Sequence, residues 1–387
     1  MILFRKPKQA ELILSSRHEL TRFGTRRTVQ LKHPRLPKSV RADGVWFDIS
    51  MDLPEPFLQD GLVFGFLHYA MKHKAGIRIA GRVSRQALRN AQTYQEAWHC
   101  WLPDEYQPIE IVPDEVVPDE NVTFQHSAEA IACYSGGVDA TFLALRHVQN
   151  KPESYALKKV ITVHGFDIPL KDASEFKKLV LRTDDFLRSI GLQRITVVTN
   201  TRAPELIGWE HSFGPQMACM LHQFAGPFKT GMIASSDTYA FRLHPWGSSP
   251  STDYLMSGGN FQIVHDGAGF LRTEKVELIA KSPVAVAALK VCWEGKRKGE
   301  NCGHCEKCVR TRLNLLAVGL DHPACFSTPF REEMIDSLIV RNSGQLSELL
   351  QIQTYARRHG VQTTWTRRLD HRIVSVRESL NRQDALV

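Results

Sequence analysis

After residue 128 the chain alternates short apolar runs with amphipathic stretches, and this alternation constrains the fold more than any other feature. Apolar runs of strand length occur at 130–134, 158–167, 194–200 and 231–237. Stretches with helical periodicity lie between them, at 140–150, 173–192 and 215–225. Strands separated by helices join a parallel sheet, because the crossover helix returns the chain to its starting edge. The sequence therefore predicts an α/β fold whose parallel sheet is covered by helices on both faces.

Polar segments follow three of these predicted strands. They are Ser135–Asp139, His164–Asp167 and Ser235–Asp237. In open parallel sheets, ligands bind in the crevice beyond the carboxyl ends of the strands. The carboxyl edge of the sheet is therefore the expected active site.

The first of these segments, Ser135-Gly136-Gly137-Val138-Asp139, joins a strand directly to a helix. Backbone N–H groups at a helix start favour an anion, and the two glycines carry no side chain to obstruct it. A Walker A loop is excluded because no lysine follows, and a dinucleotide fingerprint is excluded because a third glycine is missing. The loop predicts a phosphate site, and the alternative is a tight turn capped by Ser or Asp.

Four cysteines lie close together at Cys292, Cys302, Cys305 and Cys308. Their Cys-x9-Cys-x2-Cys-x2-Cys spacing allows four thiolates to surround one tetrahedral ion, which predicts a structural zinc site; redox or chance thiols are the alternative. His304 lies between the ligands, but four sulfurs complete the shell without it. The other cysteines stand among apolar residues and are expected to be buried and inert: Cys100, Cys133, Cys219 and Cys325.

The loop "SGGVDA" resembles the Ser-Gly-Gly-x-Asp-Ser loop of the PP-loop ATP pyrophosphatases. Those enzymes cleave ATP between the α and β phosphates, and the loop holds the departing pyrophosphate. The resemblance implies that residues of this loop bind the nucleotide here: Ser135, Gly136, Gly137, Val138 and Asp139. Ala140 replaces the second serine of the family, and the adjacent Thr141 is the expected substitute.

The loop and the later cysteines, in this order, resemble the 7-cyano-7-deazaguanine synthase (QueC) group over roughly residues 128–320. This resemblance implies a Rossmann-like sheet of the adenine nucleotide alpha hydrolase type, with ATP, Mg²⁺ and structural Zn²⁺ as cofactors. It also implies a substrate such as 7-carboxy-7-deazaguanine, whose carboxylate is adenylated and then converted to an amide or nitrile. Residues 1–125 precede the loop and the first cysteine gap is one residue longer than usual, which favours a paralogue.

Further site residues follow from position and from the resemblance. The first turn of a predicted helix at 272–280 contains Arg272, Thr273 and Lys275. The helix dipole disfavours cations at this end, so an anion such as phosphate is the expected partner of the two cations. The expected catalytic residues are Ser135, Asp139 and Lys275. The remaining expected nucleotide contacts are His164, Asp167 and Ser235, with Asp167 as a ligand of magnesium.

Two weaker candidates lie nearby. The stretch 244–260 is a long loop that carries Trp246 and Tyr254, which are expected either to stack on a purine-like ring or to pack at the surface. His265 and Asp266 are candidates of the same kind, for which a satisfied turn is the alternative.

An N-terminal accessory α+β domain is predicted at 1–105. Its strands are expected at 44–53 and 76–84, and its helices at 62–73 and 85–101. The stretch 103–120 contains seven acidic residues, four prolines and no basic residue, a composition that keeps a chain extended. Residues 106–125 are therefore predicted to be a linker.

The ATPase domain is predicted at 126–325, with its zinc site at 292–308, and residues 326–387 predict a helical basic extension. The net charge is +8, and residues 1–42 carry eleven Lys and Arg against two Glu. Such charge permits nucleic acid or phosphate-rich ligands, although the aromatic interleaving of nucleic-acid modules is missing. No run of eighteen apolar residues and no signal-like N-terminus occur, so a cytoplasmic location is expected. A homodimer is expected as well.

Four functions remain open at this stage. The first is the adenylating enzyme described above. The second is an antiviral-defence paralogue that joins a deazaguanine to a protein partner recruited by residues 1–125. The third is a tRNA-modifying PP-loop enzyme, and the fourth is a non-catalytic module that binds nucleotide.

Overall fold

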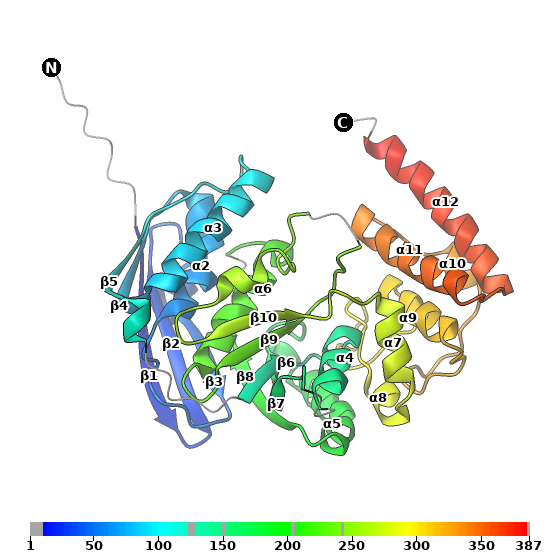
Figure 1. Cartoon of the computed structure of the whole chain (residues 1–387), viewed down its shortest axis with the longest axis horizontal. Helices are drawn as coiled ribbons and strands as arrows, with labels where there is room; N and C mark the ends of the chain where they lie inside the picture. Colours follow the sequence, from blue (N-terminus) through cyan, green and yellow to red (C-terminus); the bar gives the residue numbers. More distant parts are fainter. Residues whose placement is uncertain (1–10, 123–128, 149–151, 203–205, 241–243, 385–387) are drawn as a thin grey trace.

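The computed structural model describes residues 11–122, 129–148, 152–202, 206–240 and 244–384. Ten strands in these ranges form one sheet, in the order β10-β9-β6-β7-β8-β3-β2-β1-β4-β5 (Figure 1). The fold is α/β, as the sequence predicts, and most neighbouring strands run parallel.

Five parallel strands form the half of the sheet that carries the predicted site. They are β6 (Glu129–Cys133), β7 (Ala156–His164), β8 (Gln193–Thr199), β9 (Thr230–Ala234) and β10 (Gln262–Asp266). The four strands expected in this region are confirmed. Strand β10 was not predicted, because its five residues follow a long loop and carry a weak pattern.

Helices cover both faces of this half. Alternate residues of β6 point to opposite faces, so Ile131 joins one hydrophobic core while Ala130 and Ala132 join the other. The first core contains α6 (Trp209–Leu221), and the second contains α4 (Val138–His147) and α5 (Ala173–Ser189). The expected coverage of both faces is confirmed.

The N-terminal part extends the same sheet. It contains β1 (Leu12–Thr21), β2 (Gly24–Lys32), β3 (Val45–Ile49) and β4 (Ile77–Ser84), with helices α1 (Lys38–Asp43), α2 (Asp60–His73) and α3 (Arg85–Trp101). Strand β3 pairs antiparallel with β8, with Phe47 opposite Thr199. The sheet is therefore continuous from the N-terminal part into the strands that carry the loop.

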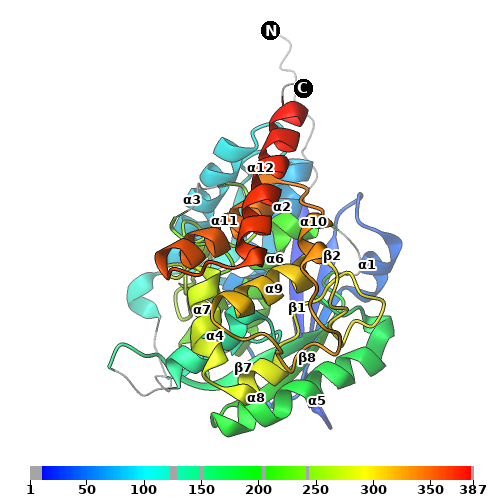
Figure 2. The same ribbon diagram turned by 90° about the vertical axis from the view of Figure 1, so that its right-hand side faces the viewer.

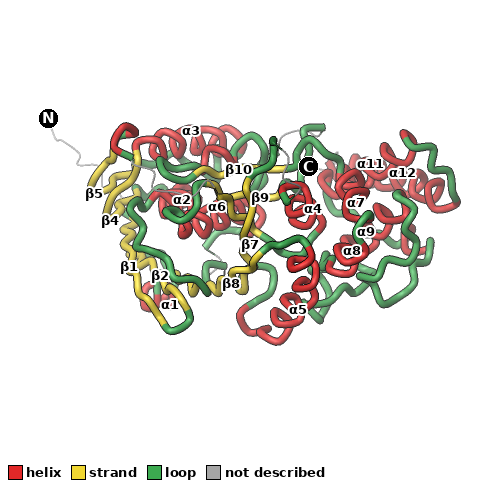
Figure 3. Tube along the Cα trace, turned by 60° about the horizontal axis from the view of Figure 1, so that its bottom comes forward, coloured by secondary structure: helices red, strands yellow, loops and turns green. Residues whose placement is uncertain are grey.

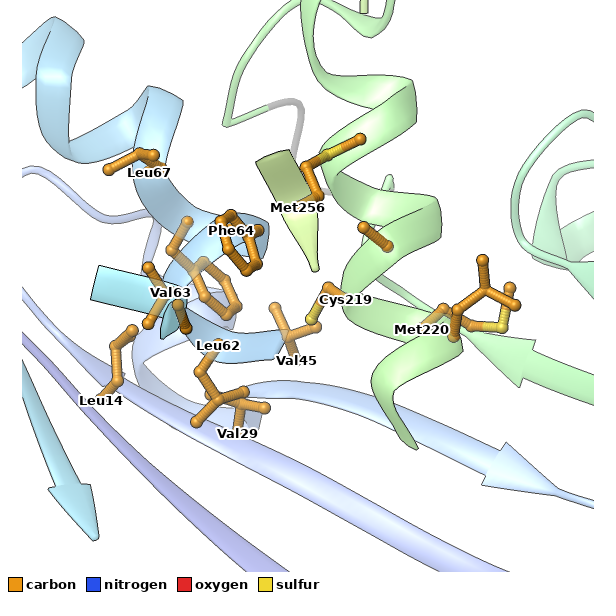
Figure 4. Close-up of a cluster of buried hydrophobic side chains, with 14 of the residues drawn as sticks. Leu14, Val29, Val45, Leu62, Val63, Phe64, Leu67, Cys219, Met220 and Met256 are labelled. Atoms are coloured by element: carbon orange, nitrogen blue, oxygen red, sulfur yellow. The ribbon is translucent and has the colours of Figure 1, made fainter. Parts of the chain in front are cut away.

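The hydrophobic core also crosses this junction. Side chains of α2 pack against the N-terminal strands and lie beside Cys219 of α6, whereas Met220 is on the side of α6 turned away from α2 (Figure 4). A Cβ atom at Gly65 of α2 would lie 2.7 Å from Cys219 Sγ, so the two helices approach closely because this position is glycine. Cys219 and Cys325 are buried as expected, Cys133 is partly buried and Cys100 is exposed, which corrects the prediction that all four outlying cysteines are buried.

The stretch predicted as a linker contains a strand. β5 (Ile111–Val117) pairs parallel with β4 at the end of the sheet, with Ile77 opposite Ile111. The prolines tolerate this position because an edge strand has one side without ladder hydrogen bonds. The extended conformation was predicted correctly, but pairing with β4 makes this segment part of the sheet.

The C-terminal helices pack beyond α4 and α5. They are α7 (Arg272–Ala280), α8 (Pro283–Ala288), α9 (Glu306–Ala317), α10 (Glu333–Asp336), α11 (Ser343–Arg358) and α12 (Thr364–Asp384). Figures 1 and 3 show these helices together at one end of the molecule, opposite β1, β4 and β5, and Figure 2 views the molecule from that end. In the part of the chain that the structure describes, none of the helices is long and apolar enough to span a membrane.

Candidate functional site

The loop predicted to bind phosphate lies at the carboxyl end of β6. Gly136 has φ +78°, a left-handed conformation that favours glycine, and Gly137 precedes the first residue of α4. Ser135 is exposed, and its Oγ accepts a hydrogen bond of 3.3 Å from the N–H of Gly137. The first N–H groups of α4 have no acceptor within the helix. The loop therefore presents backbone donors beside an exposed hydroxyl.

The three predicted polar segments are neighbours. Strand β6 pairs with β7 on one side and β9 on the other, and all three run parallel. Their carboxyl ends meet at one edge, which places Ser135–Asp139 between His164–Asp167 and Ser235–Asp237.

Asp139 is bound by two cations. Its Oδ1 lies 3.1 Å from Lys275 Nζ, and its Oδ2 lies 3.0 Å from Arg272 Nη2. Burial raises the pKa of Asp139, but Arg272 and Lys275 outweigh burial and hold the pKa below its usual value. The carboxylate is thus charged at neutral pH and fixed in place.

These contacts supply a partner for the cations of the α7 first turn. The sequence suggested that phosphate is the partner of Arg272 and Lys275. In this structure, Asp139 pairs with both cations, and Glu348 also pairs with Arg272. Lys275 is 1% exposed and also donates to the carbonyl oxygen of Ser235 at 2.5 Å. The Thr273 hydroxyl is buried and donates to Asn314 Oδ1 at 2.6 Å. Asp139 therefore positions Lys275 and Arg272 beside the loop.

The ion pairs continue into the C-terminal helices. Arg272 Nε lies 3.3 Å from Glu348 of α11, and Glu348 pairs with Arg310 of α9 at 3.0 Å. Arg310 also pairs with Glu306 at 3.0 Å. The chain of alternating charges is mostly buried and consists of Lys275, Asp139, Arg272, Glu348, Arg310 and Glu306. The predicted extension thus reaches the loop through Glu348.

Four other expected nucleotide contacts are buried, and two of them bond to other parts of the protein. His164 stacks on Phe176 with centroids 4.6 Å apart, and its Nε2 lies 3.1 Å from the carbonyl oxygen of Pro169. Ser235 is fully buried and donates to the Asp237 carbonyl. Val138 and Thr141 are buried in α4, so the Thr141 hydroxyl lies inside the fold rather than at its surface.

Asp167 differs from these residues because it is exposed at the end of the β7 loop. No hydrogen bond or ion pair of its carboxylate is found among the described residues. It remains the expected residue at this edge that is best placed to bind a solvated ion.

Two lysines at the site were missed by the sequence reasoning. Lys290 donates its backbone N–H to the Gly136 carbonyl at 2.8 Å, and its side chain is buried, with the residue 7% exposed. Burial lowers the pKa of Lys290, and the charge of Asp167 opposes this effect. Lys307 follows the first residue of α9, and Asp167, Arg272 and Asp139 are among its charged neighbours. Both lysines lie in the segment around the four cysteines (residues 289–308), which we call the cysteine knuckle, close to Cys292 and Cys308. This position is the sequence signal that could have identified them.

The four predicted metal ligands form a compact cluster. Their Sγ atoms all lie within 4.8 Å of one another, with Cys292 to Cys305 at 3.7 Å and Cys302 to Cys308 at 3.8 Å. Four sulfurs about 2.3 Å from one zinc ion stand about 3.8 Å apart in a tetrahedron. The spacing fits a zinc ion and is far too long for a disulfide, whose S–S bond is about 2.05 Å. His304 is exposed and hydrogen bonds to the Cys302 carbonyl, outside the cluster.

The side chain of Asn301 hydrogen bonds to the backbone around Lys290 and Cys292. Its Oδ1 accepts from the N–H groups of Val291 and Cys292, at 2.8 and 3.1 Å. Its Nδ2 donates to the carbonyl of Leu289 at 2.9 Å. These bonds lie on both sides of Lys290, whose backbone N–H is bonded to Gly136 of the Ser135–Asp139 loop.

The weaker candidates take part in packing and buried pairs. Trp246 is half-buried and packs on Phe213 at 5.7 Å, whereas Tyr254 is 56% exposed. His265 Nδ1 lies 2.7 Å from Asp253, and Asp266 pairs with Arg146 at 2.8 Å. His265 and Asp266 therefore each pair with another side chain of the protein, as the alternative interpretation expected.

The chain was compared with protein-family models, curated proteins and solved structures, and none of them matches it.

Proposed function

We propose that this protein is an ATP-dependent ligase that releases pyrophosphate and AMP. The observation that carries the proposal is the Ser135-Gly136-Gly137 turn at the carboxyl end of β6, with its backbone donors and with Arg272 and Lys275 held beside it by Asp139. Such a turn stabilises the charge that develops on a departing pyrophosphate. The resemblance of "SGGVDA" to PP-loop enzymes supports cleavage between the α and β phosphates.

The proposed first step activates a carboxylate. A substrate carboxylate oxygen attacks the α phosphorus of ATP, the bond to the bridging oxygen breaks, and pyrophosphate leaves with the electron pair. The loop amides and the Ser135 hydroxyl bind the leaving group. Asp139 holds Lys275 and Arg272 beside it.

The proposed second step transfers the acyl group. A nitrogen nucleophile attacks the acyl carbon, AMP leaves, and the nitrogen loses a proton to give an amide. With ammonia, the amide oxygen attacks the α phosphorus of a second ATP and pyrophosphate leaves. The oxygen then departs as part of AMP while the nitrogen loses its two protons, which gives a nitrile. The deazapurine carboxylate of the resembling group is the proposed substrate, and the exposed ring of Tyr254 is a candidate to stack on it.

Asp167 is the residue proposed to hold Mg²⁺. Magnesium in nucleotide sites takes one or two carboxylates together with phosphate oxygens, and the exposed carboxylate of Asp167 fits this requirement. When bound, the ion neutralises charge on the phosphates.

The test is a product assay with ATP, Mg²⁺, 7-carboxy-7-deazaguanine and ammonium chloride as the nitrogen source. We expect AMP and pyrophosphate in equal amounts. ADP with orthophosphate would refute the proposed cleavage, and ATP binding without AMP release would favour a nucleotide-binding module. Gly136→Ala is the loop variant, because its Cβ would lie 3.2 Å from Thr183. Gly191→Ala is the control, because Gly191 has φ +71° and nothing within 4 Å of its added Cβ.

A protein amine is the second candidate acceptor. The turn between β1 and β2 exposes Leu20 and Phe23, which are 68% and 74% exposed. Exposed apolar side chains at a hairpin tip favour contact with another protein. Intact-mass measurement of candidate partner proteins, after incubation with ATP and the deazaguanine acid, tests this acceptor. An added mass supports it, and unchanged masses with amide or nitrile formation support ammonia.

A further inference from the structure

We propose that Lys290 and Lys307 bind the polyphosphate of the ligand, so that the cysteine knuckle forms one wall of the phosphate site. The identity of the ligand as ATP rests on the proposed function. The placement of the two lysines does not, because it follows from their contacts and charges.

Lys290 carries the first part of the argument. Its main-chain N–H is bonded to the Gly136 carbonyl, and its Cβ would be 3.6 Å from a Cβ atom placed on Gly136. The residue is more than nine-tenths buried. Among the described residues, no carboxylate lies within ion-pair distance of its ammonium group, and no hydrogen-bond acceptor is found for it. Most of this side chain is buried, and its ammonium group, with no partner among the described residues, is available to an anionic ligand.

Lys307 approaches from another element. It lies in the first turn of α9, and its charged neighbours include Asp167, Arg272 and Asp139. Asp167 is also the carboxylate that acts most strongly on Lys290. Lys307 is exposed, and Asp167 at the end of the β7 loop is a charged neighbour that the two lysines share.

The charges at this edge favour an anion. Asp139 is already neutralised by Lys275 and Arg272, and Arg272 is shared with Glu348. Asp167 then remains beside the two lysines, and Asp237 at the same edge, whose pKa is raised by burial, lies 3.9 Å from His244 Nε2. A polyphosphate completes this arrangement, with Mg²⁺ at Asp167 and the lysines on the phosphate oxygens.

The knuckle explains why these lysines are fixed. Lys290 stands two residues before Cys292, and Lys307 stands directly before Cys308. Asn301 bonds the main chain on both sides of Lys290, to Leu289 and to Val291. The cluster that predicts a structural metal therefore also sets the positions of two cations at the loop.

The test measures binding of inorganic pyrophosphate by calorimetry to the full-length protein. The variants are Lys290→Met and Lys307→Met, and the control is Lys296→Met, an exposed lysine of the same knuckle. We expect each site variant to bind roughly 10-fold or more weakly than the wild-type protein, because each loses a charged hydrogen bond. The control is expected to bind like the wild-type protein.

Folding is checked separately, since Lys290 is buried. Zinc content and circular dichroism report on the knuckle and the fold, and Lys290→Arg is expected to retain more pyrophosphate binding than Lys290→Met. Binding by both Met variants that equals that of Lys296→Met would overturn the proposal. So would an equal loss in the Arg and Met variants of Lys290. Pyrophosphate binding without AMP formation would instead refute the proposed function and leave the lysine sites standing.

Discussion

Replacing Asp139 by Asn tests the charge arrangement at the loop most directly. The substitution keeps the size of the side chain but removes the negative charge that faces Lys275 Nζ at 3.1 Å and Arg272 Nη2 at 3.0 Å. Lys275 is 1% exposed, so its charge stays buried without a carboxylate. Removing one partner of a buried pair costs about 3–5 kcal/mol. In the Asp139→Asn variant, Arg272 still pairs with Glu348 and Lys275 still donates to the Ser235 carbonyl. We therefore expect the free energy of unfolding to fall by about 3 kcal/mol, the lower end of this range.

The assay is urea unfolding followed by circular dichroism, with Asp185→Asn as the matched control. Asp185 pairs with Arg188 at 2.6 Å, but the two side chains are 80% and 74% exposed. An exposed pair contributes at most about 1 kcal/mol. A loss in Asp139→Asn no larger than that in Asp185→Asn would refute the reasoning. The double variant Asp139→Asn with Lys275→Met should recover part of the loss, because no unpaired ammonium then remains.

The pH dependence of the same pair has a fixed sign. The folded-state pKa of Asp139 is lowered, so its contribution to stability is fully present above its unfolded pKa of about 3.9. That contribution is lost as the pH falls through the folded-state value. The stability difference between the wild-type protein and Asp139→Asn should therefore be constant near pH 7 and shrink below about pH 4. A difference that grows on acidification would contradict the assignment.

Three further outcomes are expected. Cys305→Ser should lower the bound zinc measured by mass spectrometry and make the knuckle more sensitive to protease, since one of four sulfur ligands is lost. Gly136→Ala should weaken pyrophosphate binding while Gly191→Ala does not, although both residues have positive φ, because only the first position is crowded and lies at the loop. Phe47→Ala should lower the free energy of unfolding by about 3–5 kcal/mol, because this fully buried residue lies in the strand that joins the two parts of the sheet.

Local patterns in the sequence determined much of this fold. Helix α3 at Arg85–Trp101 and helix α7 at Arg272–Ala280 begin and end where their periodicity predicts. Strands β6, β7, β8 and β9 were recognisable because each is a short apolar run between helical stretches. The meeting of their carboxyl ends also followed from sequence, since parallel connection sends those ends to one edge. The spacing of the four cysteines predicted a cluster that the structure contains.

Other elements depended on partners far away in the chain. The β1–β2 hairpin carries many charged residues, and its strand identity comes from long-range pairing and from one buried face. The acidic stretch around β5 looked like a linker because its extended conformation was visible in composition but its pairing with β4 was not. A pattern within a segment records which face is buried, and it does not record which segment buries it.

The same distinction applies at the site. The sequence by itself determined the Ser-Gly-Gly turn, because two glycines between a strand-like run and a helical stretch specify a turn within a few residues. Only the tertiary structure decided that Arg272 and Lys275 pair with Asp139, more than a hundred residues away. It also decided that Thr141 faces the interior and that Lys290 reaches the loop through the knuckle. Charge partners and burial are set by which elements pack together, and that packing is a property of the whole chain.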